Sequence, residues 1–251
     1  MELVMVIVIL GIIGVLGADF IGKGFKGFHD TENRAAMFEE GSLAMTRMER
    51  EIHNAIPNAV DIASSTDLRF GMIDEAAMDR IFGQYTETNP TGTTQITDND
   101  PTPLVTGLPA DAIISIYNRK WEDFSTRLYA LDSTYAANTN PLILDSTKPI
   151  IDSSPRRRYY VVDKVIRYQL DTVTNTLFRA EDAVSKNGPG DFSTSTNYPL
   201  AKNVTLTNNS NLFTYTPGTL NRNGVVSINF TLKRGGEEVS FHKEVHIFNV
   251  P

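Results

Sequence analysis

The chain contains no cysteine, which excludes a disulfide framework and a thiolate metal site. It holds 251 residues with a formal net charge of -7. This acidic balance argues against a general binder of nucleic acid or other polyanions. Hydrophobic residues make up 41% and charged residues 21%, as in an ordinary globular protein. The length therefore allows one large domain or two small ones.

Charge is also absent from the run Leu3–Ala18, and no lysine or arginine precedes it. A charge inside hydrocarbon costs about 2.5–3.5 kcal/mol on insertion scales, so Glu2 at the start of such a run implies a partner. The run corresponds to about 24 Å of helix, and extending it to Ile21 approaches the ~30 Å of a bilayer core. We expect a membrane helix over about residues 3–21, with these membrane-embedded side chains: Leu3, Val6, Ile9, Leu10 and Ile13.

Two simple interpretations of this run are a cleaved signal peptide and a plain membrane anchor. A signal peptide would have a basic region before the run and a small-residue cleavage site after it. An anchor explains the hydrophobicity but not Glu2. A third interpretation depends on the next segment.

Residues Thr31–Ile56 show a helical pattern that Pro57 ends. One stripe of this helix is predicted to pack against the rest of the chain; its members are Phe38, Met45, Met48, Ile52 and Ala55. Arg47 and Glu51 form an i,i+4 pair that we place on the outer face. The glycine-rich stretch Gly22–Gly27 predicts a weak, melted joint, since each interior glycine costs about 1 kcal/mol relative to alanine.

Beyond Pro57 the pattern changes to strands. Alternating apolar residues at 166, 168 and 170, followed by a polar turn at 171–175, predict a hairpin. A second hairpin is predicted around Gly235-Gly236, with a bulge near His242 left open. Polar stretches at residues 86–110, 132–155 and 185–223 indicate loops or insertions. The fold class is α+β: a long helix over residues 1–57, packed through its second half on an antiparallel sheet domain over residues 58–251.

Candidate chemistry is sparse. His242 and His246 lie too far apart on one strand, about 13 Å, to bind the same ion. The segment Asp98–Asp100 could offer oxygens to Ca²⁺ but lacks the glycine and distal glutamate of an EF-hand loop, which favours a solvated turn. No P-loop, nucleophile elbow or dinucleotide motif occurs in the sequence. We therefore expect no enzyme activity, no cofactor and no metal.

One basic cluster precedes two tyrosines. Its members are Arg156, Arg157 and Arg158. Such a cluster could contact phosphates or stack on bases. It is also typical of a strand end whose arginines bind acidic neighbours such as Asp152 or a second subunit. We favour this second interpretation and expect no DNA partner.

The segment Glu2–Val15, ELVMVIVILGIIGV, resembles the N-terminal signature of type IV pilins and type II secretion pseudopilins. Arg47–Val60 resembles the helix end of larger minor pilins, namely the PilW type, J-type pseudopilins and especially the O-type minor pilin of mannose-sensitive haemagglutinin (MSHA) pili. His246–Pro251 is similar to the ending of that last group. Glu2 matches the family's glutamate at the fifth mature position. Only Met1 stands where the family has its leader and first four mature residues, so the cleavage site and the methylated residue lie outside the sequence.

The resemblance implies a pilin-like fold and a role in assembly, priming or tip structure of an MSHA-type pilus, including cell adhesion. It implies that Glu2 pairs with the N-terminal amine of a neighbouring subunit and sets the axial register. Implied partners are other major and minor pilins, the inner-membrane assembly platform, and lipid before assembly. The implied location is a single pass through the bacterial inner membrane with the head in the periplasm, then the pilus. Lys23 and Lys26, counted alone, would instead retain residues 22–251 in the cytoplasm.

Two classes of function therefore compete. The first is the minor pilin, with a type II secretion pseudopilin as its close alternative. The second is an exported binding domain or enzyme that the helix merely tethers to the membrane. A tethered enzyme would need a pocket with converging polar groups, and the sequence shows none.

Overall fold

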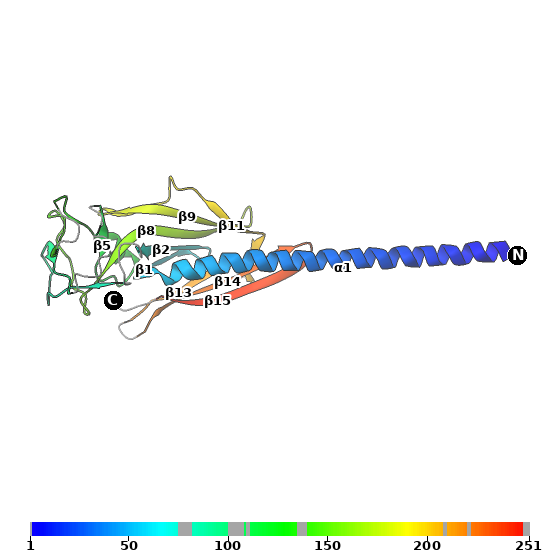
Figure 1. Ribbon diagram of the computed structural model, residues 1–251, viewed down its shortest axis with the longest axis horizontal. Coiled ribbons are helices and arrows are strands. Elements are labelled where there is room, and N and C mark those ends of the chain that lie inside the picture. Colours follow the sequence, from blue (N-terminus) through cyan, green and yellow to red (C-terminus); the bar gives the residue numbers. More distant parts are fainter. Residues whose placement is uncertain are drawn as a thin grey trace.

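A single long helix projects from one side of a β-rich head (Figure 1). The computed structural model describes residues 2–74, 82–99, 108, 111–134, 140–207, 210–219 and 222–247. Helix α1 (Glu2–His53) is followed by a second, short helix, α2 (Trp121–Thr126), within the head. The expected α+β architecture is confirmed. The helix ends at His53, earlier than Pro57, because Ala55 already pairs with Met72 in a strand.

The larger sheet is antiparallel, and among the described residues it contains nine strands. Its path is β1-β2-β8-β5-β6; β9 lies along β8 and pairs in turn with β10 and β11, and β3 also pairs with β8. The bounds are β1 (Ala55–Ser64), β2 (Asp67–Ile73), β3 (Gly83–Gln84), β5 (Ile113–Ser115), β6 (Leu128–Ala130), β8 (Arg158–Asp171), β9 (Thr176–Ser185), β10 (Gly188–Pro189) and β11 (Tyr198–Lys202).

A second, four-stranded sheet lies on the other side of the head core. In it β14 (Gly224–Arg234) pairs with β15 (Glu237–Ile247), and also with β12 (Val204–Thr205) and β13 (Phe213–Thr216). Two further short strands, β4 (Gln95–Ile96) and β7 (Leu142–Ile143), pair with each other. The stretches expected as loops thus contain short strands, because edge pairing needs only backbone groups and tolerates polar side chains.

Both predicted hairpins are confirmed. In the first, Asp171 pairs with Thr176, and the Asp171 carboxylate accepts a hydrogen bond from the Val173 backbone at 2.9 Å. In the second, Gly235 and Gly236 have φ of 62° and 90°, as a two-residue type I′ turn requires. The register from Arg234–Glu237 to Gly224–Ile247 is continuous, so no bulge occurs near His242.

The C-terminal part of α1, from Met37 to Ile52, forms one side of the main hydrophobic core. It packs chiefly against β15 and β14, and its buried residues join apolar residues of both sheets: Met37, Ala44, Met45, Met48 and Ile52. The approach of helix and strand is close at Gly41, where an added Cβ atom would lie 2.2 Å from the Phe241 ring. A separate apolar cluster includes Tyr129, Tyr159 and Ile114 of β5. Strand β5 lies at the end of the head away from the N-terminus (Figure 1). The head is therefore built around the last third of α1.

Candidate functional sites

The first half of α1, residues 2–28, packs against no other described part of the chain; we call it the rod. Its 18-residue apolar window has a mean hydropathy of 2.7 and is 0% buried. The five side chains predicted to be embedded in a membrane are all exposed, at 49–73% of their surface: Leu3, Val6, Ile9, Leu10 and Ile13. By length and composition this helix can cross a membrane.

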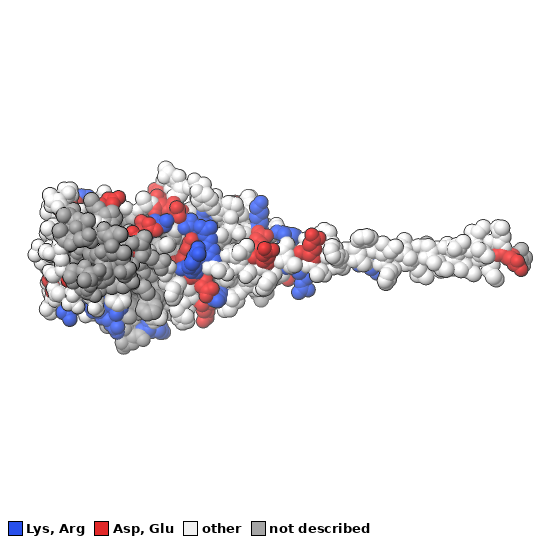
Figure 2. All heavy atoms as spheres, in the orientation of Figure 1, with Lys and Arg blue, Asp and Glu red and all other residues white. Residues whose placement is uncertain are grey.

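Glu2 lies at the free end of this rod. Figure 2 shows the projecting helix almost without charged atoms between that acidic end and the head. Among the described side chains of α1, the first fully buried one is Met37, which lies 35 positions after Glu2, or about 50 Å along the helix. Any partner of Glu2 must therefore come from outside this chain's head.

The melted joint expected at Gly22–Gly27 is wrong for this structure, because α1 is continuous from Glu2 to His53. Helix is already nucleated on both sides of the glycines, so only the cost of propagation through them remains. Thr31 supports the next turn by donating a hydrogen bond from Oγ1 to the Gly27 carbonyl oxygen at 2.8 Å. The rod and the helix in the head core thus form one element without a linker.

Four of the five residues of the predicted packing stripe are buried, and one of these, Ala55, lies in β1 beyond the end of the helix. Met48 and Ile52 are fully buried and Met45 is 8% exposed, whereas Phe38 is 62% exposed. At about 100° per residue, Phe38 lies about 80° around the helix from Met48, at the edge of the buried arc. Its ring lies beside that of Phe241, with centroids 6.2 Å apart. Met37, about 20° from Met48, takes the buried position instead.

The predicted i,i+4 pair of Arg47 and Glu51 is confirmed, but its placement on the outer face is wrong for Glu51. Glu51 is 7% exposed and accepts hydrogen bonds from Arg179 Nε at 2.9 Å and from the Tyr168 hydroxyl. Arg47 is half exposed and adds a contact of 3.2 Å. Glu51 lies about 60° from Met48, close enough to the apolar stripe to turn toward the sheet. Its partner Arg179 lies 128 residues further along the chain, so the sequence carried no local signal for this burial.

This buried network links the end of α1 to β8 and β9. Burial raises the pKa of Tyr168, and the neighbouring Glu51 charge raises it further. Burial lowers the pKa of Arg179, but the hydrogen bond and charge of Glu51 outweigh this effect and raise it. Tyr168 is therefore a neutral donor and Arg179 a permanent cation. Together they fix the rotation of α1 against the larger sheet.

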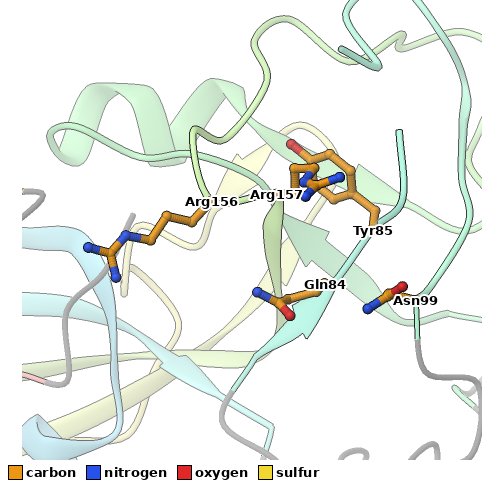
Figure 3. Close-up of a pocket in the computed structure, with 5 residues that line it drawn as sticks. All are labelled: Gln84, Tyr85, Asn99, Arg156 and Arg157. Carbon is orange, nitrogen blue, oxygen red and sulfur yellow. The ribbon is translucent and has the colours of Figure 1, made fainter. Parts of the chain in front are cut away.

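The three arginines at the start of β8 do not form one basic surface. Arg157 has φ of 56°, and Figure 3 shows Arg156 and Arg157 extending in different directions from their turn. They line a small polar pocket of about 80 Å³ together with Gln84, Tyr85 and Asn99. Arg158 instead stacks on Phe82, with its guanidinium carbon 3.8 Å from the ring centre.

The predicted acidic neighbour, Asp152, binds other arginines, namely Arg127 at 2.5 Å and Arg119 at 3.9 Å. A DNA backbone needs several cations on one face. The divergence of Arg156–Arg158 does not offer that arrangement.

The remaining candidate ligands are dispersed. His242 and His246 are exposed on β15, and the His246 carbonyl oxygen lies 3.1 Å from His53 Nδ1. Asp98 is buried and accepts a hydrogen bond from the Tyr159 hydroxyl, while Asp100 lies outside the described residues. Within the described part of the chain, no three histidine, aspartate or glutamate side chains come together as metal ligands.

No protein-family profile, curated protein or solved structure matches this chain. The residues and their arrangement are therefore the basis for the functional proposal.

The separation of rod and head predicts that residues 28–251 fold without the apolar run. The glycines from Gly11 to Gly27 have no neighbour within 4 Å beyond the local helix, so removing the run deletes no contact with the head there. We expect a soluble product with a cooperative unfolding transition and mixed helix and strand signals by circular dichroism. An aggregated or molten product would show instead that the head depends on the lower helix.

Proposed function

We propose that this chain is a minor pilin-type subunit, a structural protein with no enzymatic role. In this proposal the exposed half of α1 holds the subunit in a membrane and later packs among the helices of other subunits in a thin filament. The observation that carries it is the continuity of α1, in which an apolar, solvent-exposed rod and a buried core helix are the same rigid element. A plain tether needs only to span the bilayer, and nothing requires it to be rigidly fixed to its domain.

Glu2 supports the same proposal. At the end of an apolar rod, a carboxylate in a water-free helix bundle needs a cationic or hydrogen-bonding partner. The resemblance of Glu2–Val15 to the pilin signature supplies one, the N-terminal amine of a neighbouring subunit. Such an ion pair would set how far adjacent rods are staggered along the filament.

The Glu51 network supports it as well. A subunit that transmits force from rod to head must resist rotation of one against the other. Glu51 and Arg179 are buried charges that pair across the helix–sheet boundary, with side chains 9% and 6% exposed. Breaking such a pair is strongly unfavourable.

The proposal is tested by locating the chain in cells. Filaments sheared from the surface are expected to contain it as a minor component, and the reading frame upstream is expected to encode a short basic leader ending in glycine. A chain found in membranes but never in filaments or an assembly-initiating complex would favour the tethered binding domain. A type II secretion pseudopilin would be recognised by loss of secretion, with piliation intact, when the chain is deleted.

A further inference from the structure

The part of α1 between the predicted membrane span and the head is two-sided. We call residues 20–28 the neck. Three of its side chains are large, aromatic and strongly exposed: Phe20 at 79%, Phe25 at 73% and Phe28 at 72%. The neck also carries Lys23 and Lys26, both exposed. Its composition therefore differs from the charge-free run Leu3–Ala18.

Helical geometry separates these two kinds of residue. Taking about 100° per residue from Met48, the apolar neck residues occupy one arc about 140° wide: Phe20, Ile21, Phe25 and Phe28. Lys23 and Lys26 lie on the opposite side, about 20° and 40° from the Met48 direction. That direction is the side on which α1 packs into the head. The neck thus has an apolar side facing away from the head and a basic side beneath it.

The apolar side includes a shallow hollow of about 440 Å³ lined by Ile21, Gly24, Phe25 and Phe28. It continues the apolar surface of the preceding helix without a break. From Leu3 to Phe28 this side is about 38 Å long, longer than a ~30 Å hydrocarbon core. On the opposite side the first charged residue is Asp19, which precedes Lys23 by four residues. The charge-free length there, counted from residue 3, is about 24 Å, shorter than the core. The apolar length therefore differs between the two sides of the helix, and a helix perpendicular to the bilayer cannot match both lengths to the thickness of the core.

We propose that the neck lies in the membrane interface with its apolar side against lipid, so that α1 crosses the bilayer at a tilt. The tilt lowers Phe25 and Phe28 into the region between headgroups and acyl chains, where aromatic side chains are favoured. It raises Lys23 and Lys26 toward the headgroup phosphates on the side that carries the head. An overlong apolar side is accommodated in this way, and interfacial aromatic and lysine residues set the direction of tilt. The head therefore lies on the side of the tilted helix that faces away from the bilayer.

This inference rests on the membrane placement in the proposed function. The bilayer is the expected occupant because the apolar side is continuous with the membrane-crossing surface and the lysines stand where anionic headgroups would be. A second α1 helix seated in the hollow is the competing occupant, and the experiment separates the two.

The absence of cysteine makes the test direct, because a single introduced cysteine is the only labelling site. Spin labels are placed in the full chain on the apolar side with Phe25→Cys and Phe28→Cys, and on the basic side with the matched variants Lys23→Cys and Lys26→Cys. The chain is reconstituted in vesicles of phosphatidylethanolamine with a minority of phosphatidylglycerol. Collision with oxygen, which concentrates in lipid, is compared with collision with a water-soluble nickel chelate.

The ratio of oxygen to nickel accessibility is expected to alternate with the helical period, high at positions 25 and 28 and low at 23 and 26. High nickel accessibility at all four positions would overturn the proposal by placing the neck in water. High oxygen accessibility at all four would overturn it by placing the whole neck in the bilayer. Immobilised spectra at 25 and 28 that depend on protein density would overturn it in favour of a second helix.

A label at Leu10→Cys distinguishes this failure from failure of the membrane placement. If Leu10→Cys is exposed to oxygen while position 25 is exposed to nickel, the span is correct and only the tilt is wrong. If Leu10→Cys is exposed to nickel, the membrane placement itself is wrong.

Discussion

Replacing Glu51 with alanine is expected to lower the free energy of unfolding of the head by about 3 kcal/mol. The substitution removes the carboxylate that Arg179 and Tyr168 share inside the helix–sheet boundary. Breaking a buried ion pair usually costs about 3–5 kcal/mol. We expect the lower end of that range because Arg179 keeps a second partner, Glu181, at 2.9 Å. Denaturant unfolding of the detergent-solubilised chain, followed by circular dichroism, measures the change.

The matched control is Glu49→Ala, two residues earlier on the same helix. Glu49 pairs with Lys243 at 3.0 Å, but both side chains are 43% exposed, so its loss should cost less than about 1 kcal/mol. A combined variant with Glu51→Leu, Arg179→Met and Tyr168→Phe should recover most of the lost stability, because it leaves no buried charge unpaired. Equal effects of Glu51→Ala and Glu49→Ala would mean that the network does not hold the rod to the head.

Replacing Glu2 with alanine is expected to reduce incorporation into filaments at least about tenfold, because losing an ion pair in a water-free bundle costs more than the ~1.4 kcal/mol that a factor of ten represents. The head should remain folded, since Glu2 lies about 50 Å of helix before Met37, where α1 becomes buried in the head. The measurement compares the chain in sheared filaments with the chain in membranes, in a deletion strain that expresses each variant.

Glu122→Ala provides the control for this experiment. Glu122 is an acidic residue of α2 in the head, with a side chain 70% exposed, so its replacement changes the net charge equally without touching the rod. Wild-type incorporation of Glu2→Ala would remove the role we give to this carboxylate. A parallel loss in Glu122→Ala would point to net charge instead of the position of Glu2.

The elements with strong local patterns could be predicted from the sequence. The stripe through Met45, Met48 and Ile52 repeats at helical spacing, and the strands around Ile166 and Phe230 alternate strictly. Each hairpin also has its turn residues in place, with Asp171 at one and two glycines at the other. These features depend on neighbours along the chain, so one sequence is enough to find them.

Features that depend on distant pairing could not be predicted. Glu51 has the polarity of a surface residue, and only its contact with Arg179, far along the chain, places it inside. The short strands such as β4 and β7 have no alternation of their own and form because the rest of the fold brings their backbones together. Phe38 shows the converse, since its apolar character predicted burial but its angular position leaves it at the rim.

The candidate site was largely visible in the sequence because it is a single continuous segment. Glu2 and the apolar residues after it need no folding partner within the chain to be recognised. The arginines at 156–158 were adjacent in sequence but diverge in space, because a turn with Arg157 at positive φ points their side chains apart. Adjacent residues in a sequence can be expected to share one surface only where the backbone keeps a regular helix or strand conformation.

The most direct test of the central proposal follows the same molecules over time. Cells are given a brief pulse of labelled amino acid, and the chain is then recovered separately from membranes and from sheared filaments at intervals. The proposal predicts that labelled chain appears first in the membrane and then passes into filaments with its N-terminal helix intact. Label that stays entirely in the membrane, while other filament subunits leave it, would contradict the proposal.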